Sequence, residues 1–229
     1  MSKKKSNKVM PILSIVFFGV SLVVFMAQAG YCIIYRLVLL GGATFAHALL
    51  AESGKAAAMA FPAVFFMITA ALYLKQSAQY KKMFTVSMIM QFISAVLIAA
   101  RLVYANALFS QNANKVSYPL FAAYALVALL CLIAAVFVIK DKKDKPIMIV
   151  TAAVGICIAL YLFSMNVYAV AANFAYYSQH IFIMGSILIK GTLYLLSLSF
   201  YYIAFLFAAL FKKQVKSEAK KVKVAIKAN

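Results

Sequence analysis

The sequence predicts an all-α integral membrane protein, a bundle of six transmembrane helices with both chain termini in the cytoplasm. Composition is the first observation behind this prediction, because 67% of the 229 residues are hydrophobic and only 12% are charged. Soluble domains carry roughly half apolar and about a quarter charged residues. The second observation is a series of six long apolar runs, and the third is the clustering of basic residues beside those runs.

The apolar runs are long enough to cross a bilayer, which takes a helix of about 20 mostly apolar residues. None of them alternates with the period of two that is typical of barrel strands, so helices are expected. The predicted spans are 10–35, 58–75, 83–106, 118–139, 147–172 and 181–211. They divide the chain into a basic N-terminus (1–9), a six-helix membrane domain (10–211) and a basic C-terminal tail (212–229).

The first span follows the basic segment MSKKKSNK and therefore resembles a secretory signal peptide at its start. Its apolar stretch runs past the roughly 7–15 residues of a signal-peptide core. We therefore expect a retained membrane span.

The basic residues predict the orientation of the bundle. Eighteen of the 23 Lys and Arg residues fall in the N-terminus, in the loops 75–82 and 140–146, and in the C-terminal tail. Cytoplasmic loops carry an excess of Lys and Arg, so these segments and both termini are predicted to be cytoplasmic. The remaining five bases, expected on the outer side, are Arg36, Lys55, Arg101, Lys115 and Lys190.

The four prolines agree with the predicted span boundaries. Each is expected at or near the first turn of a span, where the missing N–H removes no helical hydrogen bond. They are Pro11, Pro62, Pro119 and Pro146. No proline is then expected in mid-span, and the sequence shows no sign of the broken helices that secondary transporters use.

Three segments next to the spans have their own patterns. Residues 41–57 predict either a loop or a short interfacial helix that runs from Thr44 to Ser53 and ends at Gly54. Residues 175–189 predict an outer loop or an interfacial helix. The C-terminal tail repeats apolar residues at helical spacing among lysines, which indicates either a basic amphipathic helix on anionic lipid or a solvated tail.

A weak internal repeat relates spans two and three to spans four and five. Each pair has an aromatic residue followed by proline near its start, a lysine-rich turn between its two spans, and the residues Val-Tyr-Ala near its end. This pattern indicates either a tandem repeat of two helical hairpins or the features that any two hairpins of equal orientation share.

Lys190 interrupts the apolar run of span six and raises the question of a charge inside the membrane. Counted back from Phe211 at 1.5 Å per residue, Lys190 lies about 31 Å along the helix, roughly the thickness of the hydrocarbon. We therefore expect it to mark the outer end of span six. Arg101 is expected at the outer interface by the same count, and both side chains are long enough to reach the headgroups.

A second interpretation makes these bases part of a binding site. Arg36, Arg101 and Lys190 are predicted at a similar depth near the outer face, where Glu52 is the only acid. Tyr104 and Tyr168 are expected at that depth too. These five are the candidate ligand-binding residues for an anionic or zwitterionic small molecule in an outward-open pocket. The alternative is a belt of interfacial tyrosines and basic side chains.

The sequence offers little material for catalysis. None of the four acids falls in mid-span, and no nucleophile motif or phosphate-binding loop is present. No enzyme activity, cofactor or metal is expected. The cysteines are expected to pack as small apolar residues, and the mid-span amides to bond across helices or to line a solute path. These residues are Cys32, Cys131 and Cys157, and Gln28, Gln91 and Asn166.

These observations favour a small multi-pass protein that handles a solute, as a permease-type or substrate-capturing subunit. The alternative is a non-catalytic accessory or assembly subunit of a larger membrane complex. In size and topology the chain resembles the vitamin-capturing subunits of energy-coupling transporters, and that resemblance implies an ATPase and a coupling protein on other chains. The expected partners are the lipid bilayer, anionic lipids at the basic tail and other membrane subunits, not nucleic acid. The expected location is a bacterial plasma (inner) membrane.

Overall fold

The computed structural model describes residues 8–40, 45–108, 117–140 and 144–227, and it describes side chains for residues 8–34, 53–103, 118–140 and 144–210. All regular structure in these ranges is helical, which confirms the predicted fold class. The helices are α1 (Val9–Leu40), α2 (Phe45–Leu74), α3 (Tyr80–Leu108), α4 (Ser117–Ile139), α5 (Lys145–Ala172), α6 (Phe174–Gln179) and α7 (Ile181–Lys227).

Six of these helices are long and apolar enough to cross a membrane. Their outward faces carry large apolar side chains, among them Val23, Leu97, Leu129 and Leu160, each more than half exposed. A water-soluble monomer rarely exposes so much contiguous apolar surface. The chain is therefore a multi-pass membrane protein.

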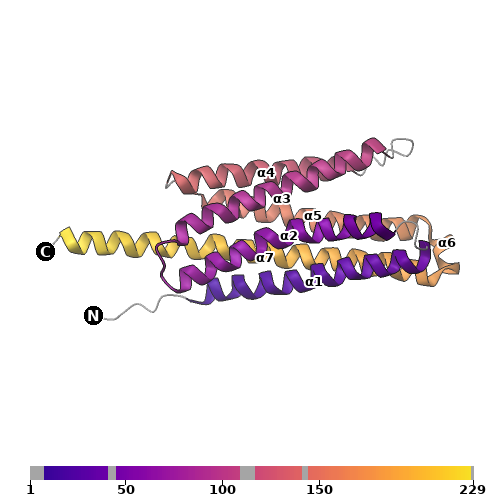
Figure 1. Cartoon of the computed structure of the whole chain (residues 1–229), viewed down its shortest axis with the longest axis horizontal. Helices are drawn as coiled ribbons and strands as arrows, with labels where there is room; N and C mark the ends of the chain where they lie inside the picture. The colour runs from indigo at the N-terminus through magenta and orange to yellow at the C-terminus, as the bar shows by residue number, and fades with distance from the viewer. Residues whose placement is uncertain (1–7, 41–44, 109–116, 141–143, 228–229) are drawn as a thin grey trace.

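The six long helices form a closed ring. Each of the helices α1 to α4 packs against the next one along the chain. Helix α5 packs against α7, and α7 packs against α1, which closes the ring. The seam between α4 and α5 is the sparsest of the six. The start of α1 lies at one end of the bundle and α6 at the other (Figure 1). We call these the Val9 end and the α6 end.

Small polar residues join α1 to α7. Ser14 Oγ donates a hydrogen bond to the Ala204 carbonyl at 3.1 Å, and Ser21 Oγ donates to the Ser197 carbonyl at 2.9 Å. Ser197 Oγ in turn donates to Gln28 Oε1 at 3.3 Å. The α1 residues recur every seventh position, so they form one antiparallel seam of the kind that small residues allow in membranes.

A cluster of aromatic side chains fills the half of the bundle near the Val9 end. Phe66 is its centre: the Phe18 ring stacks on it at 5.4 Å and the Phe205 ring meets it edge-on at 5.2 Å. Tyr201 meets Phe18 edge-on at 5.2 Å. With Phe84, these residues are fully buried. We call them the aromatic cluster, and it closes the interior of the bundle at this depth.

The structure corrects two expectations in α2. The helix runs without interruption from Phe45 to Leu74, so the predicted helix end at Gly54 is wrong, and Pro62 lies in mid-helix. The alanine-rich segment after Gly54 has strong helix propensity and outweighs a single glycine. Pro11, Pro119 and Pro146 do lie in first turns as predicted.

The structure also corrects the position of Lys190. Helix α7 begins at Ile181, so Lys190 lies nine residues into it, or about 13 Å along its axis. Lys190 therefore does not mark the end of span six. Residues 175–179 belong to α6, and residues 181–189 form the first turns of α7. The segment between Ile181 and Lys190 is itself apolar, so the helix and the span continue through it.

Helix α7 continues to Lys227 and extends beyond the bundle at the Val9 end (Figure 1). The side chains of the C-terminal tail lie outside the described residues. The amphipathic face expected there stays a prediction, as does the tandem repeat of hairpins.

Candidate functional site

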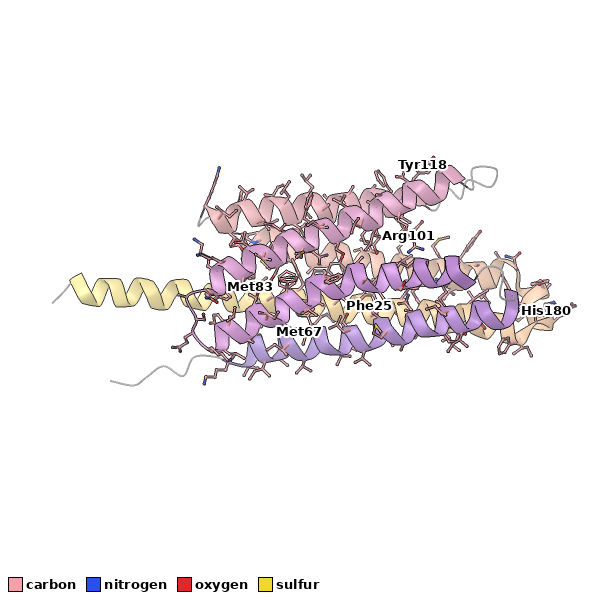
Figure 2. The ribbon with its side chains drawn as sticks, viewed as in Figure 1. Phe25, Met67, Met83, Arg101, Tyr118 and His180 are labelled. Atoms are coloured by element: carbon pink, nitrogen blue, oxygen red, sulfur yellow. The ribbon has the colours of Figure 1, made fainter. Side chains whose placement is uncertain are left out.

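A cavity of about 290 Å³ lies between the helices in the half of the bundle toward the α6 end, and all six long helices line it. Figure 2 shows Arg101 at this depth, well separated from Met67 and Met83 near the Val9 end. The polar side chains of the lining are Gln28, Lys55, Arg101, Tyr124, Asn166, Lys190 and Tyr194. The larger apolar ones are Phe25, Met59, Ile98, Leu102, Leu120, Leu162 and Leu198.

Helical spacing explains how each element contributes. On α7, Lys190, Tyr194 and Leu198 follow one another at intervals of four residues, so they share one face. On α3, Arg101 and Leu102 follow Ile98 by three and four residues in the same way. The cavity is therefore lined by one face of each helix, with charged and apolar residues mixed.

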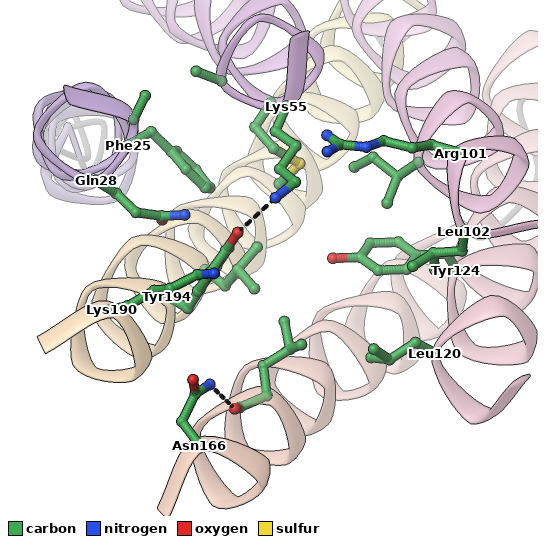
Figure 3. A pocket seen from close by; sticks show the side chains of 16 residues that line it. Phe25, Gln28, Lys55, Arg101, Leu102, Leu120, Tyr124, Asn166, Lys190 and Tyr194 are labelled. Atoms are coloured by element: carbon green, nitrogen blue, oxygen red, sulfur yellow. Dashed lines mark hydrogen bonds between the residues drawn. The ribbon is translucent and has the colours of Figure 1, made fainter. Parts of the chain in front are cut away.

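Three cationic side chains line this cavity: Lys55 from α2, Arg101 from α3 and Lys190 from α7. Each is half-buried. Figure 3 shows the ends of Lys55 and Arg101 reaching into the same space. None of the described lining residues is acidic. Like charges that converge in a medium of low dielectric disfavour one another, so the arrangement favours a negatively charged guest.

Lys55 is held in place by Tyr194. Its Nζ atom donates a hydrogen bond to Tyr194 Oη at 3.1 Å and lies 5.8 Å from the centre of the Tyr194 ring (Figure 3). Tyr194 lies one turn after Lys190 on α7. The bond therefore fixes the Lys55 ammonium group against the face of α7 that also carries Lys190.

The amide side chains are fixed by neighbouring groups. Gln28 accepts the hydrogen bond from Ser197, and Gln91, below the cavity, accepts one from Tyr201. These two confirm the predicted bonds across helices. Asn166 differs, because its Nδ2 donates to the Leu162 carbonyl of its own helix at 2.6 Å. Gln28 and Asn166 also line the cavity.

A close approach of α5 and α7 occurs beside Lys190. A Cβ atom added to Gly191 would lie 2.9 Å from Asn166 Cβ, closer than such atoms pack. Glycine at this position lets the two backbones meet, which places Asn166 beside the face that carries Lys190.

The structure brings together part of the predicted site. Arg101 and Lys190 line one cavity, whereas Tyr168 does not line it and is 67% exposed. Tyr168 follows Asn166 by two residues, so it points about 200° away around α5. The side chains of Arg36 and Tyr104 lie outside the described residues. Ligand binding by the candidate residues stays a prediction.

Sequence reasoning missed Lys55, Tyr124 and Tyr194. Lys55 was not predicted to line a site, because residues 41–57 were expected to lie on the membrane surface and not in a span. The spacing of four residues between Lys190 and Tyr194 was a signal that these two share a face. Nothing in the sequence indicated that α2 presents Lys55 to that face.

A comparison with known protein families, with curated proteins and with solved structures finds no match for this chain.

Proposed function

We propose that this protein binds an anionic small molecule in the cavity toward the α6 end, as a permease-type or substrate-capturing membrane subunit. The observation that carries the proposal is the convergence of Lys55, Arg101 and Lys190 on one cavity whose described lining has no acid. Ionisable groups inside a membrane are costly, and they usually mark a substrate path or binding site.

The side chains suit recognition of a carboxylate or phosphate. The Arg101 guanidinium is a planar fork that can bind two oxygens at once, and the lysine ammonium groups supply compact positive charge. The Tyr124 hydroxyl, which points into the cavity in Figure 3, adds a neutral hydrogen-bonding group. A zwitterionic guest is less well matched, because the described lining residues include no carboxylate for its cationic part.

The aromatic cluster supports capture over open conduction. It lies between the cavity and the Val9 end and contains Phe18, Phe66 and Phe205, all fully buried. In this conformation the aromatic cluster lies across the route from the Val9 end to the cavity. If the Val9 end is cytoplasmic, as the lysine distribution predicts, the cavity receives its guest from the outer half of the membrane.

The test is ligand-dependent thermal stability of the purified protein. A panel of carboxylates and phosphate esters is added to the protein in neutral detergent, and the melting temperature is measured. We expect at least one anion to raise it, by about 2–4 °C per kcal/mol of binding free energy. Lys190→Ala and Arg101→Ala should abolish that rise.

Lys140→Ala is the matched control, since Lys140 is exposed at the Val9 end and far from the cavity. It should keep the full response. A response that survives both cavity substitutions, or that no anion produces, argues against the proposal. Indifference to the cavity substitutions together with a stoichiometric protein partner would instead favour the accessory-subunit alternative.

A further inference from the structure

We infer that the anion is a lipid, with a phosphate headgroup among the three cations and a hydrocarbon chain that leaves the cavity between α4 and α5. This inference rests on the proposed function and names its ligand class. Three features of the described residues lead to it: the charge of the cavity, the apolar part of its lining and the sparse seam beside it.

The charge favours a phosphate monoester. Lys55, Arg101 and Lys190 together bring three positive charges, and no described acid of the lining offsets them. A carboxylate neutralises one of these charges, whereas a phosphate monoester carries about −1.5 to −2 at pH 7 and three acceptor oxygens. The phosphate therefore presents one acceptor oxygen for each of the three cationic side chains.

The apolar lining favours a guest that also carries hydrocarbon. Leu120, Leu162 and Leu198 face the cavity from three different helices, and Phe25 and Met59 complete the apolar wall. An inorganic anion would leave this surface without a matching partner. An acyl chain gains free energy for each methylene that the wall covers.

The seam between α4 and α5 gives that chain a route into the bilayer. Leu120 and Tyr124 from α4 and Leu162 and Asn166 from α5 all line the cavity, so both sides of the seam border it. The seam is also the most sparsely packed of the ring. In Figure 1 the α3–α4 hairpin diverges from α2 and α5 toward the α6 end, where the cavity lies. A lipid can therefore enter sideways from the membrane.

The wild-type protein supports the first experiment. It is reconstituted in phosphatidylcholine nanodiscs, and the affinity for oleoyl lysophosphatidate is compared with that for glycerol phosphate, which has the head but no chain. We expect lysophosphatidate to bind at least about tenfold more tightly, because two or more methylenes are covered. Oleoyl lysophosphatidylcholine, which has the same chain and no net charge, should not compete.

A second experiment locates the chain. The protein contains no tryptophan, so Leu162→Trp introduces a single tryptophan at the seam, which can be excited selectively. Leu160→Trp is the matched control on the same helix, since Leu160 is 53% exposed toward lipid. A lysophosphatidate with a brominated chain should quench the Leu162→Trp fluorescence in a saturable way. The Leu160→Trp fluorescence should be quenched weakly, and equally by brominated lysophosphatidate and lysophosphatidylcholine.

The outcomes separate the two proposals. Should glycerol phosphate bind as tightly as lysophosphatidate, anion binding stands and the lipid inference is wrong. Should lysophosphatidylcholine bind as well as lysophosphatidate, the headgroup assignment is wrong. If neither phosphate compound binds and other anions do, only the lipid inference falls; if no anion binds, both fall. Failure of Leu162→Trp to fold leaves the wild-type affinities to decide.

Discussion

Most of the buried polar side chains among the described residues carry a definite hydrogen bond. Tyr201 and Tyr202 are adjacent in the chain and both are fully buried, but their hydroxyl groups differ in hydrogen bonding. The Tyr201 hydroxyl donates to Gln91 Oε1, whereas the Tyr202 hydroxyl has no hydrogen-bond partner among the described residues. The pair therefore isolates the value of one interhelical hydrogen bond.

We expect Tyr201→Phe to lower the free energy of unfolding by about 1 kcal/mol, because Gln91 loses its partner in the bundle interior. Tyr202→Phe removes a hydroxyl that gains nothing here, and should leave stability unchanged or raise it. The measurement is the melting temperature of each variant in the same detergent. Equal losses for both variants would show that the Tyr201–Gln91 bond contributes no net stability.

At the scale of the helix, the bundle depends on close approaches that only glycine allows. Gly155 on α5 packs against the ring of Tyr202 on α7, at a distance that leaves no room for a Cβ atom. Gly191 makes the corresponding approach to Asn166 nearer the cavity. These two contacts set the spacing of α5 and α7, and so the width of the cavity wall that they form.

Gly155→Ala should therefore destabilise the protein by about 1–3 kcal/mol, as overpacking of a close interface does. The control is Gly19→Ala on α1, where an added Cβ meets nothing within 4 Å, and which should be neutral or slightly stabilising. Thermal unfolding in detergent measures both. A neutral Gly155→Ala would mean that the Tyr202 ring moves aside at little cost.

At the scale of the whole molecule, the ring has a closed half and an open half. The aromatic cluster fills the half near the Val9 end, while three cations line a cavity in the half near α6. The orientation of these halves decides which side of the membrane supplies the guest. The distribution of the lysines predicts that the closed half is cytoplasmic.

Labelling of introduced cysteines in intact cells tests this orientation. Gln79→Cys lies in the turn before α3 and is exposed, so a membrane-impermeant thiol reagent should reach it only after the cells are opened. Ser178→Cys on α6 is also exposed and should react in intact cells. The three native cysteines are replaced first. Reaction of Gln79→Cys from outside would reverse the orientation and the direction of capture.

The sequence by itself determined the six spans and their approximate ends. The hydrocarbon core demands a fixed length of apolar helix, and polar or charged residues mark where each length stops. Span four, predicted at 118–139, matches Tyr118–Ile139. Counting residues along a helix did not give the depth of Lys190, because α7 and its span continue to Ile181, nine residues beyond the predicted end.

The tertiary structure decided which charges share a chamber. Lys55, Arg101 and Lys190 come from three helices, and their convergence depends on the rotation of each helix about its own axis. That rotation is set by contacts between helices, such as the α1–α7 serine seam and the meeting of Gly191 with Asn166. In a membrane-spanning helix every face is apolar, so hydrophobicity alone does not show which face points into the bundle.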